Sequence, residues 1–155
     1  MSADSDSREQ LPHLGWLEWC ALPELGVPLL QAKVDTGAKT SSLHAEELEI
    51  VDVGGKHVAR FLVHTRRAEY RCECPVHDER HVKSSSGHEE LRVVVRTLCV
   101  LGRKRWRIEL TLTDRTAMKF PMLLGRGAMA ERFAVDPSAV YLRGRPKTKR
   151  KPRAS

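Results

Sequence analysis

Asp35, Thr36 and Gly37 have the residue types and the order for hydrolytic chemistry by carboxyl groups. Peptide hydrolysis needs a base that activates water and an acid that protonates the leaving group. Two carboxyl groups within hydrogen-bond range do both, because they share one proton. The glycine lets two such turns approach closely, and the threonine hydroxyl can brace one turn against the other. The tripeptide alone also fits an ordinary turn at the end of a strand, where all three residue types are common.

The surrounding sequence favours the chemical interpretation. An apolar stretch at 29–34 precedes Asp35, and a second apolar stretch at 120–124 ends in Gly125 and Arg126, followed by residues suited to a short helix. No other aspartate in the chain is followed by Thr-Gly. A mechanism with paired carboxyl groups therefore requires a two-fold homodimer that brings Asp35 of each chain together.

This order of segments resembles the retropepsins, in which the two segments cross beneath the active site as interlocked loops and an intervening hairpin forms a flap. A closer resemblance covers almost the whole ordered chain. Residues 32–45 look like the signature of the bacterial family labelled "putative ATP-dependent zinc protease", and 82–88, 108–115 and 118–126 support the match. The resemblance implies a retropepsin-like fold, from which neither ATP nor zinc follows.

Members of that family accompany ATP-grasp ligases that add glutamates to the C-terminus of a ribosomal protein. The resemblance therefore implies an aspartic endopeptidase that acts as a homodimer on poly-glutamate tails. In this reading Asp35, Thr36 and Gly37 form the catalytic turn, and no cofactor or metal is needed. Two alternatives stay open: a non-catalytic module of the same fold that binds acidic protein segments, and a zinc-dependent hydrolase.

Basic and hydroxyl-bearing side chains near the turn are suited to an acidic substrate, because arginine, lysine and hydroxyl groups donate hydrogen bonds to carboxylates. Within this set, Arg80, Lys83 and Arg115 are the predicted lining of an acidic-peptide groove. Solvated surface charge is the alternative reading, and Arg126 could serve dimer contacts instead. The predicted substrate-binding residues are Lys39, Thr40, Ser41, Ser42, His44, Arg80, Lys83, Ser84, Ser85, Arg115 and Arg126.

Cys72, Cys74, His77 and His81 could supply four ligands to a tetrahedral zinc ion. A single residue separates the two cysteines and a proline follows at once, which departs from the common zinc spacings. The chain also lacks a His-Glu-x-x-His sequence. We therefore favour an exposed loop without metal for this segment.

Alternating apolar and polar residues predict many short strands, at 14–22, 29–35, 46–53, 57–64, 91–101, 105–113 and 118–124. A short helix is expected at 127–133 and an edge strand at 135–142, while 66–87 reads as a long hairpin tip or an exposed loop. The predicted fold is all-β and mainly antiparallel, a retropepsin-like closed barrel with one short helix. The expected domain spans 13–143, between a disordered N-terminus at 1–12 and a disordered basic tail at 144–155.

The composition supports a modest core built from aliphatic side chains, since 41% of the residues are apolar and only 5% are aromatic. A net charge of +7 favours an anionic partner. The tail carries many basic and no acidic residues, so it could contact RNA or the ribosome through phosphates, or act as a solubilising end. No apolar run approaches the roughly 20 residues of a membrane helix, and no signal peptide is recognisable. We expect a cytoplasmic protein without membrane association, whose four cysteines are thiols or metal ligands.

Overall fold

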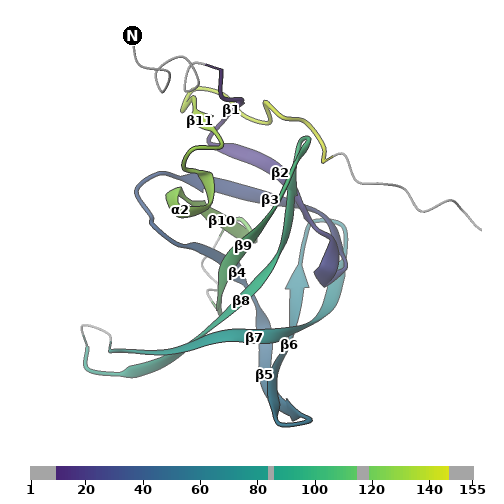
Figure 1. Cartoon of the computed structure of the whole chain (residues 1–155), viewed down its shortest axis with the longest axis vertical. Coiled ribbons are helices and arrows are strands. Elements are labelled where there is room, and N and C mark those ends of the chain that lie inside the picture. Colours follow the sequence, from purple (N-terminus) through teal and green to yellow (C-terminus); the bar gives the residue numbers. More distant parts are fainter. Residues whose placement is uncertain (1–9, 84–85, 115–118, 147–155) are drawn as a thin grey trace, which may run out of the picture.

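The structure is a computed structural model that describes residues 10–83, 86–114 and 119–146, without the side chains of residues 82 and 83. Strands dominate it (Figure 1), and α2 is the one α-helix among the described residues. In chain order the elements are β1 (His13–Leu14), β2 (Leu17–Leu22), the 3₁₀ turn η1 (Pro23–Leu25), β3 (Val27–Asp35), β4 (Ser41–His44), β5 (Glu46–Val53), β6 (Lys56–His64), β7 (Glu69–Lys83), β8 (Glu89–Leu101), β9 (Lys104–Thr113), β10 (Met122–Gly125), α2 (Arg126–Met129) and β11 (Ala134–Val135).

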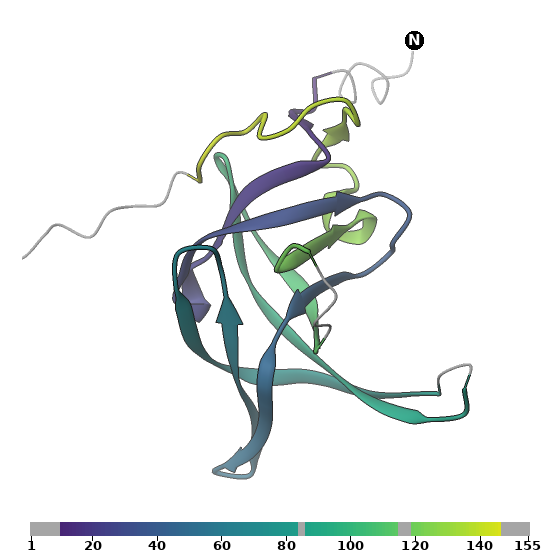
Figure 2. The ribbon, with the colours of Figure 1, turned by 180° about the vertical axis from the view of Figure 1, so that it is seen from behind.

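Six strands close into a barrel in the order β2-β3-β10-β4-β9-β8. The ring is completed where Ala21 of β2 pairs with Val100 of β8. Strands β7, β6 and β5 continue the sheet outward from β8, and the far end of the β7–β8 hairpin projects away from the barrel in both views (Figures 1 and 2). The predicted all-β, mainly antiparallel closed barrel with one short helix is confirmed.

The position of β10 brings distant parts of the sequence together. It lies between β3 and β4, parallel to β3 and antiparallel to β4. The parallel register aligns Leu124 with Val34 and Gly125 with Asp35, so both strands end at the same level. The connection from β3 to β4 then runs alongside α2 (Figures 1 and 2).

The core is aliphatic, as the composition predicts. Its fully buried side chains include Leu30, Leu43, Leu110, Met122 and Leu124, which come from four neighbouring strands of the barrel wall, β3, β10, β4 and β9. Burying such side chains is the main favourable contribution to folding. The core fixes the ends of β3 and β10, where the candidate catalytic residues lie.

A buried carboxylate joins the two ends of the described chain. Glu18 in β2 has no exposed surface, and its carboxylate accepts hydrogen bonds from the backbone N–H groups of Gly15, Leu142 and Arg143 at 2.7–3.1 Å. Nearby, the carbonyl of Trp16 accepts a bond from the N–H of Val34, the residue before Asp35. The N-terminal segment, the C-terminal segment and β3 are therefore held as one unit.

Three local predictions need correction. Residues 69–83 form strand β7, paired with both β6 and β8, so an exposed loop over most of 66–87 is wrong. The helix is a single turn at Arg126–Met129, shorter than the predicted 127–133. At 135–142 the structure has the end of β11 and one bridge, Leu17 to Val140, where an edge strand was predicted.

The predicted disordered ends fall mostly in 1–9 and 147–155, outside the described residues. No helix in the described part of the chain is long and apolar enough to cross a bilayer.

Candidate active site

Asp35 is the last residue of β3 and is half-buried. Its Oδ1 atom accepts a hydrogen bond of 2.9 Å from the N–H of Gly37, which fixes the carboxylate over its own turn. A β-carbon on Gly37 would lie 3.2 Å from that oxygen, closer than an ordinary contact. Gly37 thus keeps the turn small on the side of the carboxylate, while Thr36 is exposed beside it.

The segment at 125–127 locks this turn through backbone hydrogen bonds. The N–H groups of Arg126 and Gly127 donate to the carbonyls of Ala38 and Lys39 at 2.8 and 3.0 Å. A β-carbon on Gly125 would stand 2.4 Å from the carbonyl oxygen of Thr40, so only glycine fits there without movement. The two segments are therefore interlocked, as the resemblance to retropepsins implies.

Two predicted substrate-binding residues stabilise the turn itself. The guanidinium of Arg126 donates to the carbonyl of Gly37 at 3.1 Å and to that of Thr36 at 3.5 Å. Ser41 is buried, and its Oγ accepts a bond of 3.0 Å from the N–H of Gly125. Both side chains are committed to holding the loop, which limits what they can offer a substrate.

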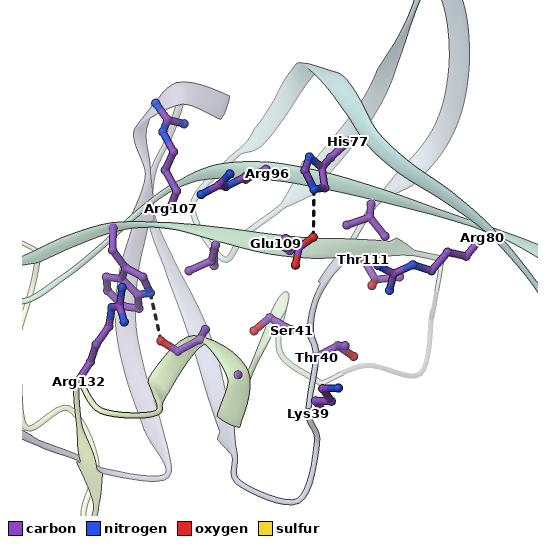
Figure 3. A pocket seen from close by; sticks show the side chains of 15 residues that line it. Lys39, Thr40, Ser41, His77, Arg80, Arg96, Arg107, Glu109, Thr111 and Arg132 are labelled. Atoms are coloured by element: carbon purple, nitrogen blue, oxygen red, sulfur yellow. Dashed lines mark hydrogen bonds and ion pairs between the residues drawn. The ribbon is translucent and has the colours of Figure 1, made fainter.

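A cavity of about 420 Å³ opens beside this loop, between it, the sheet β7–β8–β9 and α2 (Figure 3). Its lining begins at Lys39 and does not include Asp35, Thr36 or Gly37. Basic residues of several elements line it: Arg80 of β7, Arg96 of β8 and Arg107 of β9 (Figure 3). The lining residues are Lys39, Thr40, Ser41, His77, Arg80, Val94, Arg96, Trp106, Arg107, Ile108, Glu109, Thr111, Gly127, Ala128 and Arg132.

Ion pairs hold some of these cations in place. Arg80 contacts Asp78 at 2.7 Å, and its hydrogen bond lowers the pKa of that carboxyl. Arg107 makes two hydrogen bonds, of 2.8 and 2.9 Å, to Glu24 and lowers the pKa of Glu24 in the same way. The cavity wall is therefore a positively charged surface whose arginines are partly preorganised.

A family model described as "RimB-like: Retropepsin-like aspartic endopeptidase RimB" matches residues 13–146. The chain belongs to the RimB-like family. The suspected relationship to retropepsin-like peptidases is thereby confirmed.

Several relatives are longer than this chain. A "Probable alpha-L-glutamate ligase" of Desulfotalea psychrophila is 49% identical over 129 residues, which cover 81% of this chain and 28% of that protein. A protein of the same name from Shewanella pealeana is 44% identical over 135 residues, which cover 84% of this chain and 30% of the relative. The chain thus spans less than a third of these curated relatives.

The RimB-like fold also has a solved counterpart. The crystal structure of Lpg0085 from Legionella pneumophila, a protein of unknown function, superimposes with a TM-score of 0.73 at 33% identity. The match covers 85% of this chain and 98% of that one. The barrel described above is therefore shared along nearly the whole of the Legionella chain.

The other predicted substrate-binding residues of this RimB-like chain are dispersed. Lys39, Thr40 and Arg80 line the cavity. Ser42 lies on the face of β4 opposite Ser41, and His44 pairs with Glu46 and lines a different cavity of about 370 Å³. The structure does not bring His44 to the first cavity. The structure does not describe Ser84, Ser85, Arg115 or the side chain of Lys83. Of the three residues predicted to line an acidic-peptide groove, only the side chain of Arg80 is therefore placed.

Sequence reasoning missed three cavity residues: Arg96, Arg107 and Arg132. The alternation of 105–113 placed Arg107 and Glu109 on the polar face of a strand. The register that sets Arg96 opposite Glu109 depends on the pairing of β8 with β9, and no local pattern reveals it. Arg132, whose guanidinium lies 5.8 Å from the centre of the Trp106 ring, is positioned by the turn after α2.

The zinc alternative has no geometric support in the described residues. Cys72 and Cys74 point into the core, and burial raises the pKa of the Cys72 thiol to about 11. His77 lies on the exposed side and contacts Glu109 at 3.2 Å. Nowhere in 10–83, 86–114 and 119–146 do three or more metal-ligating side chains gather in a suitable arrangement. The expectation of an exposed loop around the cysteines was wrong, because alternate residues of β7 face the barrel.

Proposed function

We propose that the chain is a cytoplasmic aspartic endopeptidase that acts as a homodimer and cleaves acidic, poly-glutamate tails on a ribosomal protein. The observation that carries the proposal is the carboxylate of Asp35 on a turn locked by Gly125 and Arg126. A locked turn lets two carboxylates face each other across a two-fold axis without losing their orientation.

In this mechanism one Asp35 is ionised and the other protonated, because two adjacent carboxylates do not both ionise readily. The ionised group removes a proton from water, and the water oxygen attacks the peptide carbonyl carbon. The protonated group hydrogen-bonds the carbonyl oxygen. The first group then passes its proton to the amide nitrogen, the C–N bond breaks, and the pair again holds one proton.

Two observations support an acidic substrate: the basic lining of the cavity, and the similarity of this chain to one region of proteins named as glutamate ligases. Five arginine or lysine side chains line the cavity beside the catalytic loop. Proteins named probable alpha-L-glutamate ligases contain a region similar to this chain within a polypeptide more than three times as long as the matched region. An enzyme that removes glutamates fits alongside one that adds them. The basic tail at 143–155 would contribute contact with ribosomal RNA.

The test is a digest of a glutamate-tailed peptide and an untailed peptide of the same core sequence, followed by mass spectrometry. The wild-type protein should shorten the tail and leave the untailed peptide intact, and Asp35→Asn should abolish cleavage while binding persists. Binding without cleavage by wild type would replace the proposal with a non-catalytic module. Cleavage that survives Asp35→Asn and stops with a chelator would point to a metal-dependent hydrolase.

A further inference from the structure

The cavity lined by Lys39, Arg80, Arg96, Arg107 and Arg132, here named the cationic pocket, has a strong excess of positive charge (Figure 3). One carboxylate, Glu109, lies in its lining, and His77 contacts it at 3.2 Å. Carboxylates outside the lining compensate two of the five cations, Arg80 and Arg107, and the remaining excess of positive charge favours a ligand of opposite charge there.

We propose that the cationic pocket binds side-chain carboxylates of the substrate away from the scissile bond, with Arg96 and Lys39 as principal contacts, and so sets the position of cleavage. This inference rests on the proposed peptidase function for the identity of the substrate. The proposed subsite is separate from the turn at 35–37, because none of these three residues lines the pocket.

Arg96 and Lys39 are proposed as the principal contacts because the structure shows no ion pair for either of them among the residues that it describes. Arg80 is bound by Asp78 and Arg107 by Glu24. Within the described part of the chain, neither Arg96 nor Lys39 has an ion pair or a side-chain hydrogen bond. A guanidinium has five N–H donors and an ammonium three, so these two side chains have unused capacity for carboxylate oxygens. Arg132 also lacks an ion pair in the described part of the chain, but its guanidinium lies against the Trp106 ring.

The shape and the floor of the pocket suit glutamate. Its volume of about 420 Å³ lies within the range of small-ligand sites. Val94 and Ile108 are buried at its floor, and Trp106 is half-buried beside them. Such apolar surface packs against the methylene groups of a glutamate side chain while the charged rim contacts the carboxylate.

A neighbouring pair of like charges supports the same ligand. Arg80 of β7 lies directly opposite Arg92 of β8, an arrangement that destabilises a sheet. Arg92, Val94 and Arg96 share one face of β8, because alternate residues of a strand do so. The Nε of Arg92 is buried and has no hydrogen-bond partner in the structure. A carboxylate bound along this face offsets the repulsion between the two arginines.

The pocket has a fixed relation to the catalytic residue. Lys39 follows Asp35 by four positions, and the carbonyls of Ala38 and Lys39 are held by the N–H groups of Arg126 and Gly127. A carboxylate held by Lys39 and Arg96 therefore sits at a constant separation from Asp35. The peptide bond presented to Asp35 is then the one at a set number of residues from the bound glutamate.

Binding can be tested without catalysis by using Asp35→Asn protein. Fluorescence anisotropy would measure the Kd of a labelled poly-glutamate peptide and of a poly-glutamine peptide of equal length. Adding Arg96→Gln should weaken glutamate binding about tenfold, the size of one charge-assisted hydrogen bond, and leave glutamine binding unchanged. Lys39→Gln should act in the same direction. Arg103→Gln, in the exposed turn between β8 and β9 and outside the pocket, is the matched control and should have no effect.

Cleavage gives the second readout. A set of peptides in which a single glutamate is moved along a glutamine tail should be cut at a constant distance from that glutamate, and Arg96→Gln should scatter the cut sites. Unchanged Kd values and unchanged cut sites in both pocket variants would overturn the subsite, even if wild type cleaves. If wild type binds through Arg96 and cleaves no tail, the peptidase proposal fails and the carboxylate site stands.

Discussion

Gly125 lies against Thr40 so closely that a β-carbon on the glycine would stand 2.4 Å from the threonine carbonyl oxygen. This contact joins two segments that are about 85 residues apart in the chain and places the guanidinium of Arg126 against the backbone of the Asp35 turn. The geometry of Asp35 therefore depends on a residue whose side chain is a single hydrogen atom.

Replacing Gly125 with alanine should destabilise the fold, because backbone at both segments must move. We expect a loss of about 3 kcal/mol in the free energy of unfolding, the upper part of the usual range for overpacking, measured by urea denaturation. Gly54→Ala is the control. Its β-carbon meets nothing within 4 Å, so it should cost only about 1 kcal/mol of left-handed backbone strain. Equal losses of unfolding free energy in the two variants would show that the close contact between Gly125 and Thr40 is not critical for stability.

Arg126→Ala tests whether this arginine positions the turn or binds substrate. Its guanidinium donates to the carbonyls of Thr36 and Gly37, so we expect kcat to fall at least tenfold with little change in KM. Steady-state kinetics on the glutamate-tailed peptide provide the measurement. A rise in KM with kcat preserved would assign the residue to substrate binding instead.

Glu18→Gln probes the carboxylate that joins the chain ends. The amide keeps one acceptor oxygen in place of two, so at least one of the three backbone N–H groups loses its partner. We expect a loss of about 2 kcal/mol in unfolding free energy, since an unsatisfied buried donor is costly. The denaturation midpoint should shift accordingly, and a midpoint equal to that of wild type would contradict the assigned role.

The pair of Glu24 and Arg107 predicts a pH dependence. The pKa of Glu24 is lowered in the folded protein by its hydrogen bond to Arg107. A lowered folded-state pKa means that the pair stabilises the protein above the ordinary carboxyl value of 4.5, and that this contribution is lost as the pH falls below it. Thermal melts of wild type and Glu24→Gln should thus differ at neutral pH and converge at low pH. If the difference in melting temperature between wild type and Glu24→Gln grew as the pH fell, the predicted direction of the pH dependence would be wrong.

Much of the barrel was predictable because its strands have clear patterns. Residues 105–113 alternate apolar and polar side chains, so this part of the barrel wall could be expected from the pattern. The crossing loops were expected because the Asp-Thr-Gly and Gly-Arg segments resemble those of retropepsins. Strand β7 was missed because its inward positions include Cys72 and Cys74, which also suit metal ligands, and its outward positions are charged. Apolar periodicity gives no signal when cysteines supply the buried face.

The sequence predicted only those parts of the candidate site whose residues are neighbours in the chain. Asp35 and its turn are a short motif, whereas the five basic residues of the cationic pocket come from three strands, the loop after Asp35 and the segment after α2. Ser41 illustrates the difficulty: the sequence places a hydroxyl near the turn, but only the packing of β10 shows that it accepts the N–H of Gly125. Cross-strand register, which sets Arg96 beside Glu109, arises from the whole sheet.

The central claim is that two copies of Asp35 form one active site, and mixed dimers test it most directly. Wild-type and Asp35→Asn chains with different affinity tags would be co-expressed in equal amounts, and cleavage of the glutamate-tailed peptide measured at equal total protein. If both aspartates are required, mixed dimers isolated by sequential purification are inactive, and the total activity of the unsorted mixture is about a quarter of that of an all-wild-type sample. Mixed dimers with half the activity of wild type, or an active monomer, would contradict the paired mechanism.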